Sequence, residues 1–170
     1  MNEPRPWSFG VKFGLVAGVI GVVLLLFVIG AIAHLGPFER QELTQGELLA
    51  QGDEICRKAH AAFEQLQVKQ PQTPDQAETL MNQLISIAQD ERDRIAELNG
   101  PPAFDDEIKT YLDARDLGIE ILKRGRDAAA SSRPDNYAEA LQELAETQRQ
   151  RIQIARQVGF AECSRKIGKG

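Results

Sequence analysis

Two cysteines and one nearby histidine are the residues of this chain that could do chemistry. Cys56 and His60 belong to the string Gly-Asp-Glu-Ile-Cys-Arg-Lys-Ala-His at residues 52–60, and the second cysteine is Cys163. If residues 52–60 form a helix, Cys56 and His60 lie on the same face, because side chains four positions apart are neighbours there. Three kinds of chemistry then fit: a metal site, a thiol activated by His60 as a base, and a disulfide between the two cysteines.

A metal site is short of ligands. A structural zinc ion usually takes four protein ligands, and the only histidine besides His60 is His34, which adjoins an apolar segment. A di-iron site in a helical bundle needs a Glu three residues before a histidine, and neither histidine has one. We therefore expect no metal, no cofactor and no catalytic residue, and we predict that the chain is not an enzyme. The choice between a reactive thiol and a disulfide depends on the compartment.

Residues 14–35 predict a transmembrane helix. These 22 residues contain no Asp, Glu, Lys or Arg, and at about 1.5 Å per residue a helix of this length crosses the roughly 30 Å hydrocarbon layer of a bilayer. The alternative is a cleavable signal peptide, because Ala31-Ile32-Ala33 fits the small-x-small rule for a cleavage site. The apolar run exceeds the roughly 7–15 residues of a usual signal core, which favours a retained anchor in the cell membrane.

Charges on the two sides of this segment predict its orientation. Arg5 and Lys12 precede it, whereas the residues that follow it are net acidic, and basic flanks prefer the cytoplasm. We expect a cytoplasmic N-terminus at 1–13, a membrane segment at 14–35, a linker at 36–43, an extracytoplasmic domain at 44–165 and a basic tail at 166–170. Thiols outside the cytoplasm tend to be oxidised, so we predict a disulfide between Cys56 and Cys163.

The external part has the pattern of an antiparallel four-helix bundle. Its apolar residues recur at spacings of three and four, and Gly and Pro residues fall between these runs. The four expected helices begin near residues 44, 73, 105 and 135 and end near residues 69, 98, 130 and 158. Thr44 and Thr73 are the expected N-caps, Gly159 is the expected end of the last helix, and Leu141 is expected to point inward. Short turns between long helices favour antiparallel neighbours, so the predicted fold class is all-α.

The charge balance excludes one class of partner. The chain has 20 basic and 25 acidic residues; 18 basic and 24 acidic residues fall in residues 36–170, a net charge of −6. Proteins that bind nucleic acids present basic faces, so we expect no nucleic-acid partner.

Three segments carry a resemblance to known proteins: LTQGELLAQGDEICRKAHAAFEQL (43–66), LNGPPAFDDEI (98–108) and IARQVGFAEC (154–163). In this order they resemble a group of small exported bacterial envelope proteins, commonly actinobacterial, that are membrane-anchored or lipoprotein-type and have no known function. The resemblance covers about residues 43–165 and implies an exported helical bundle in which Cys56 pairs with Cys163. Gly52 and His60 stand where the group usually has Ala and Asn, and many members carry a signal peptide or a lipidated cysteine in place of a transmembrane anchor.

Two further sets of residues suggest contacts. Gly14 with Gly18, and Ala17 with Gly21, have the small-residue spacing that lets transmembrane helices approach closely. A partner helix or a second copy of the chain could pack there, with membrane lipid around residues 14–35. Polar side chains interrupt apolar stripes of the expected helices: Glu91 or Arg92 in the second helix, Arg115 in the third, and Gln148 and Arg151 in the fourth. These side chains form either a buried polar layer or long side chains that reach water at the stripe edges.

The leading functional hypothesis is a non-enzymatic binding or scaffolding module of the bacterial envelope, whose ligand the sequence does not identify. One alternative is an accessory subunit of a larger membrane complex. Another is a ligand-sensing bundle like those of bacterial receptors, which we would expect to signal only through a partner protein.

Overall fold

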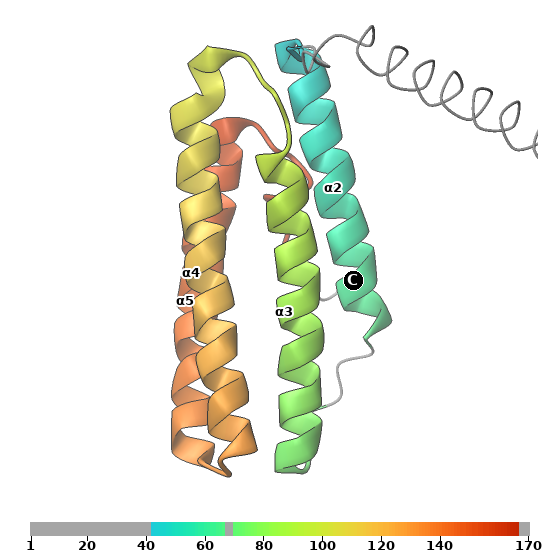
Figure 1. The fold of residues 1–170 in the computed structure, drawn as a ribbon. Helices are drawn as coiled ribbons and strands as arrows, with labels where there is room; N and C mark the ends of the chain where they lie inside the picture. The colour runs from blue at the N-terminus through green and yellow to red at the C-terminus, as the bar shows by residue number, and fades with distance from the viewer. Residues whose placement is uncertain (1–41, 67–69, 167–170) are drawn as a thin grey trace, which may run out of the picture. The chain divides into compact units, whose positions relative to one another are not determined.

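A computed structural model of the chain describes residues 42–66 and 70–166 (Figure 1). The described residues form four α-helices and no strand, which confirms the predicted all-helical class. The helices are α2 (Gln45–Gln65), α3 (Pro74–Ala96), α4 (Asp105–Ala130) and α5 (Pro134–Val158), with a short 3₁₀ helix η1 (Pro102–Phe104) before α4.

Several predicted segments lie outside the described residues. They are the cytoplasmic N-terminus at 1–13, the transmembrane segment at 14–35 with Gly14, Gly18 and Gly21, most of the linker and residues 167–170. Within 42–66 and 70–166, no helix is both long enough and apolar enough to span a bilayer.

Side-chain caps explain where the first two helices begin. The Thr44 hydroxyl accepts a hydrogen bond from the Glu47 backbone N–H at 3.3 Å, and the Glu47 carboxylate accepts one from the Thr44 backbone N–H at 2.8 Å. This reciprocal capping box satisfies two amides that have no partner within the helix. At α3, the Thr73 hydroxyl accepts from the backbone N–H of Gln76, and Pro74 occupies the first helical position, where no N–H is needed.

Gly159 ends α5 and turns the chain toward α2. Its φ of 97° lies in the left-handed region, which glycine adopts without the steric cost of a Cβ. The N–H groups of Gly159 and Phe160 both donate to the Ala155 carbonyl, at 3.1 and 2.9 Å. The predicted helix end is therefore confirmed.

The helices run alternately up and down, and each packs on its neighbour in sequence (Figure 1). α4 packs against both α3 and α5, while α2 lies along α3 and ends partway along it, so α3, α4 and α5 continue beyond α2 (Figure 1). One apolar cluster surrounds the two cysteines, and a second fills the space between α3 and α4. The second cluster contains Met81, Ile85, Ala88, Ile119 and Leu122.

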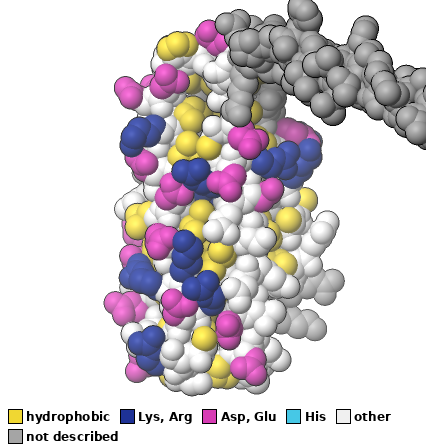
Figure 2. Space-filling model, viewed as in Figure 1, with side chains coloured by type: hydrophobic (Ala, Val, Ile, Leu, Met, Phe, Trp, Pro, Cys, Tyr) yellow, Lys and Arg dark blue, Asp and Glu magenta, His cyan; other side chains and the backbone are white. Residues whose placement is uncertain are grey.

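The outer face shown in Figure 2 carries basic and acidic side chains interspersed over its whole length, with hydrophobic side chains visible between them. Many exposed charges of the described helices pair within one helix, as Lys109 does with Asp113 at 2.6 Å. Exposed pairs of this kind contribute little to stability, because water and salt screen them. Neither sign of charge forms a continuous patch on this face.

Candidate functional site

The two cysteines lie at the distance of a disulfide bond. Their Sγ atoms are 1.98 Å apart, their Cα atoms are 5.1 Å apart, and 107 positions separate them in sequence. Both side chains are fully buried. The link joins the middle of α2 to the tail that follows α5. The backbone N–H of Glu162 adds a second connection by donating to the Asp53 carboxylate at 2.9 Å.

Gly52 makes room for the aromatic ring that holds the tail in place. A Cβ added at Gly52 would lie 2.3 Å from a ring carbon of Phe160, so α2 and the ring can approach this closely only where the helix has no side chain. Phe160 is fully buried and meets the ring of Tyr111 edge to face, with 5.8 Å between ring centroids. This packing extends from α2 through the tail to α4.

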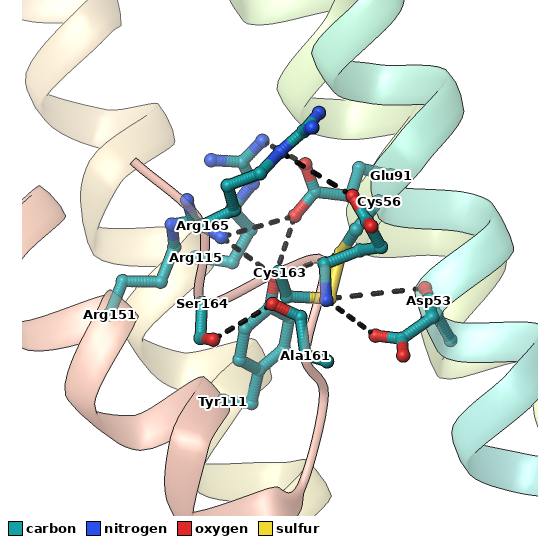
Figure 3. Close-up of a disulfide and its surroundings, with 12 residues drawn as sticks. Asp53, Cys56, Glu91, Tyr111, Arg115, Arg151, Ala161, Cys163, Ser164 and Arg165 are labelled. Carbon is teal, nitrogen blue, oxygen red and sulfur yellow. Dashed lines mark hydrogen bonds and ion pairs between the residues drawn. A yellow bond between two sulfur atoms is a disulfide. The ribbon is translucent and has the colours of Figure 1, made fainter. Parts of the chain in front are cut away.

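Beside the disulfide lies a buried set of polar side chains, which we call the Glu91 cluster: Glu91, Tyr111, Arg115 and Arg151 (Figure 3). The Glu91 carboxylate is 1 % exposed. It accepts from the Tyr111 hydroxyl at 2.7 Å and from Arg115 Nη2 at 2.5 Å. Arg151 Nη1 lies 3.6 Å from Glu91 Oε1 and donates to the Tyr111 hydroxyl oxygen at 2.9 Å. The cluster draws one residue from α3, two from α4 and one from α5.

Tyr111 links the Glu91 cluster to the disulfide. Its hydroxyl lies 3.7 Å from Cys56 Sγ, and its ring lies under the Arg151 guanidinium, 5.9 Å from the centroid. Burial and the adjacent Glu91 carboxylate raise the pKa of Tyr111. The phenol therefore stays protonated and remains a donor to Glu91.

The Glu91 cluster is not neutral. One carboxylate faces two guanidinium groups, so the cluster carries a net charge of +1 with Tyr111 protonated. Arg151 is 2 % exposed, and a buried charge is costly unless a partner offsets it. The region around Glu91 is thus electropositive in its interior although the chain as a whole is acidic.

His60 is buried next to this cluster without hydrogen bonds. His60 is 2 % exposed, and neither of its ring nitrogens has a hydrogen-bond partner among residues 42–66 and 70–166. Burial lowers the pKa of His60, and the nearby Arg151 adds to the effect while Glu91 opposes it. A neutral imidazole has one N–H donor and one nitrogen acceptor, and both are unused here.

A pocket of about 270 Å³, which we call the α2/α5 pocket, opens beside His60 where α2 and α5 face each other. Its polar end is formed by His60, Glu91, Arg115 and Gln148, and Arg115 Nε is buried there without a hydrogen-bond partner. The rest of its lining is apolar and comes from all four helices: Ala59, Phe63, Leu84, Ile87, Ala88, Leu122, Leu141, Leu144 and Ala145.

Of the residues predicted to form a polar layer, the structure brings Glu91 and Arg115 into direct contact and buries Arg151 beside them. Gln148 lies at the pocket, with only a long 3.4 Å contact to Arg151 Nε. Tyr111 was not predicted to belong to this layer. Its position three residues after Ile108 on the same helical stripe is the signal that could have found it.

One apolar residue was placed wrongly. Leu141 was expected to point inward, but its side chain is 41 % exposed and lines the α2/α5 pocket. The physical reason is that, among the described helices, α2 packs on α3 and not closely on α5, so the space between α2 and α5 stays open as the pocket.

Within the described ranges, no group of three His, Cys, Asp or Glu side chains is placed to hold a metal ion. A second cavity, of about 340 Å³, lies between the start of α3 and the turn from α4 to α5, near Pro74 and Tyr137.

Comparison of the chain with protein-family models, curated proteins and solved structures finds no match.

Proposed function

We propose that the chain is a non-enzymatic binding module of the bacterial envelope, anchored by residues 14–35 and carrying its helical bundle outside the membrane. The observation that carries the proposal is the α2/α5 pocket, which combines an apolar lining from four helices with a small polar end. Ligand sites in proteins have this composition: mostly apolar walls and a few placed polar groups that fix orientation.

The surroundings of the pocket support a binding role. The Glu91 carboxylate accepts hydrogen bonds from Tyr111 and Arg115, so it holds α3 and α4 in register. The disulfide ties α2 to the tail after α5, which fixes the wall that carries His60. Both features hold the pocket lining in place before any ligand arrives, and this lowers the entropic cost of binding.

The exposed mouth of the pocket offers a direct test. Ala145 lines the pocket and is exposed, and Ala138 is exposed on the same helix but does not line it. A photoreactive amino acid would replace each alanine in turn in the full chain, expressed in its native membranes, and irradiated samples would be examined by mass spectrometry. We expect a small-molecule adduct at position 145 and none at position 138.

Two results would contradict the proposal. A crosslink from position 145 to another protein would favour the accessory-subunit hypothesis, in which this face of α5 docks on a neighbouring chain. Equal labelling at positions 138 and 145, or no labelling at either, would show that the α2/α5 pocket holds no ligand in the cell.

A further inference from the structure

We infer that the α2/α5 pocket binds a small single-chain amphiphile with one carboxylate, the carboxylate lying against His60 and Arg115 and the apolar chain along Phe63, Leu84 and Leu144. This inference rests on the proposed function, because it names the ligand class of the same pocket.

Unused hydrogen-bonding groups at the polar end point to a ligand. Both ring nitrogens of His60 and the Nε atom of Arg115 are buried without hydrogen-bond partners. Buried polar atoms are nearly always paired, because leaving one unpaired destabilises the folded state. Both residues line the polar end of the α2/α5 pocket, so one acceptor group of a ligand bound there could satisfy both.

The local charge selects an anion. The Glu91 cluster carries one carboxylate against two guanidinium groups, and the nearby Glu162 and Arg165 form an ion pair at 3.5 Å that adds no net charge. A single negative charge would balance the excess, whereas an ammonium group would be repelled. A carboxylate has two acceptor oxygens and accepts well from a guanidinium N–H and from a neutral imidazole N–H.

The lining selects the rest of the ligand. Phe63, Leu84, Ile87 and Leu144 are half-buried along the pocket, and Leu141 is exposed at its mouth, so an apolar chain would cover surface that now faces water. The volume of about 270 Å³ is slightly below the roughly 300–1,000 Å³ of usual small-molecule sites. It suits one short acyl chain and is too small for a lipid with two long chains.

Equilibrium dialysis of radiolabelled octanoate tests the inference. The full chain would be held in lipid nanodiscs, and empty nanodiscs would measure partition of octanoate into lipid. We expect saturable binding that unlabelled octanoate displaces and that octanol and octylamine displace at least tenfold less well. Absence of saturable binding, or equal displacement by octylamine, would overturn the assignment of a carboxylate.

Variants locate the site. Ala145→Trp fills the mouth of the pocket and should abolish saturable binding, whereas Ala138→Trp, on the same helix and outside the pocket, should leave it unchanged. Both alanines are exposed, so the helix content should be preserved, and circular dichroism would check this. Binding that survives Ala145→Trp would place the octanoate elsewhere and refute the inference.

His60→Leu separates a ligand contact from a structural role. Because the His60 ring makes no hydrogen bond within the part of the chain that the structure describes, the variant should fold with an unchanged or higher Tm. It should weaken octanoate binding by about tenfold or more, the factor expected for one hydrogen bond to a charged group. A lower Tm with unchanged binding would contradict the inference. Octanoate could fail to bind while the photoreactive residue at position 145 still crosslinks to another small molecule. That result would show that the inferred ligand class is wrong and would still support the proposed binding function.

Discussion

Replacing Glu91 by Gln should destabilise the bundle far more than a loss of one surface charge would. The side chain keeps its shape but loses its charge, so the two guanidinium groups that now face one carboxylate would face none. The cluster charge would rise from +1 to +2 in the interior. The phenol of Tyr111 would also lose its charged acceptor at 2.7 Å.

The magnitude follows from the burial of the two arginines. The Arg151 side chain is 3 % exposed and cannot reach water without moving α5, whereas the Arg115 side chain is 15 % exposed and can turn outward. Removing one partner of a buried ion pair costs about 3–5 kcal/mol. Because Arg115 can regain water, we expect the lower end, about 3 kcal/mol, which is a large part of the roughly 5–15 kcal/mol that stabilises a typical domain.

Urea unfolding of the full chain in nanodiscs, with the disulfide intact and helix content followed by circular dichroism, measures this loss. Glu120→Gln is the matched control, because Glu120 is 64 % exposed and pairs with Lys123 on the surface of α4; we expect it to cost less than about 0.5 kcal/mol. Adding Arg151→Met to Glu91→Gln should recover at least half of the loss, since the unpaired buried charge is then gone. A loss below about 1 kcal/mol for Glu91→Gln, or no recovery in the double variant, would refute the assignment of a buried ion-paired cluster.

Three further predictions concern the disulfide, the packing of α2 and the pH dependence of stability. Replacing Cys56 and Cys163 together by Ala opens a loop of 107 positions. In the chain-entropy model this lowers the free energy of unfolding by about 4.7 kcal/mol, which a lower urea midpoint would show. A decrease below about 1 kcal/mol would contradict this prediction. Gly52→Ala should lower the Tm, because the added Cβ would collide with the Phe160 ring. Gly118→Ala has open space around the added Cβ and should stabilise α4 by about 0.5–1 kcal/mol. Equal effects of the two variants would refute the close approach of Phe160 to α2. Burial lowers the pKa of His60 from 6.5, so below that pH the unfolded chain binds a proton that the folded chain does not. The free energy of unfolding should therefore be highest above about pH 6.5 and should fall below it by at most about 1.4 kcal/mol per pH unit. His60→Leu should remove that slope, and an identical slope in both proteins would contradict it.

The fold was predictable because local signals and the hydrophobic pattern agree. Thr44, Thr73 and Gly159 mark helix ends through hydrogen bonds and backbone conformation that depend on a few neighbouring residues. The pairing of Cys56 with Cys163 was predictable because a chain with two cysteines allows only one intrachain link. In the structure, the Sγ atoms of these two cysteines lie at the distance of a disulfide bond.

The pocket was not predictable, because it depends on how far one helix extends along another. Leu141 has the spacing of an inward residue, yet it is exposed because α2 packs on α3 and leaves the space toward α5 open. His60 and Gly52 were visible as unusual residues, but their significance depends on tertiary contacts: the Phe160 ring against Gly52, and the pocket beside His60. Sequence spacing places residues on a helix face but does not determine what faces them.

The most direct test of the proposed envelope role is the protease accessibility of a tag placed after residue 170. The cells would be stripped of their outer layers, with the cell membrane kept intact. We expect an added protease to remove the tag while a cytoplasmic control protein stays intact, because the bundle and the end of the chain would lie outside the membrane. A tag that resists the protease until the membrane is permeabilised would place the bundle in the cytoplasm and contradict the proposal.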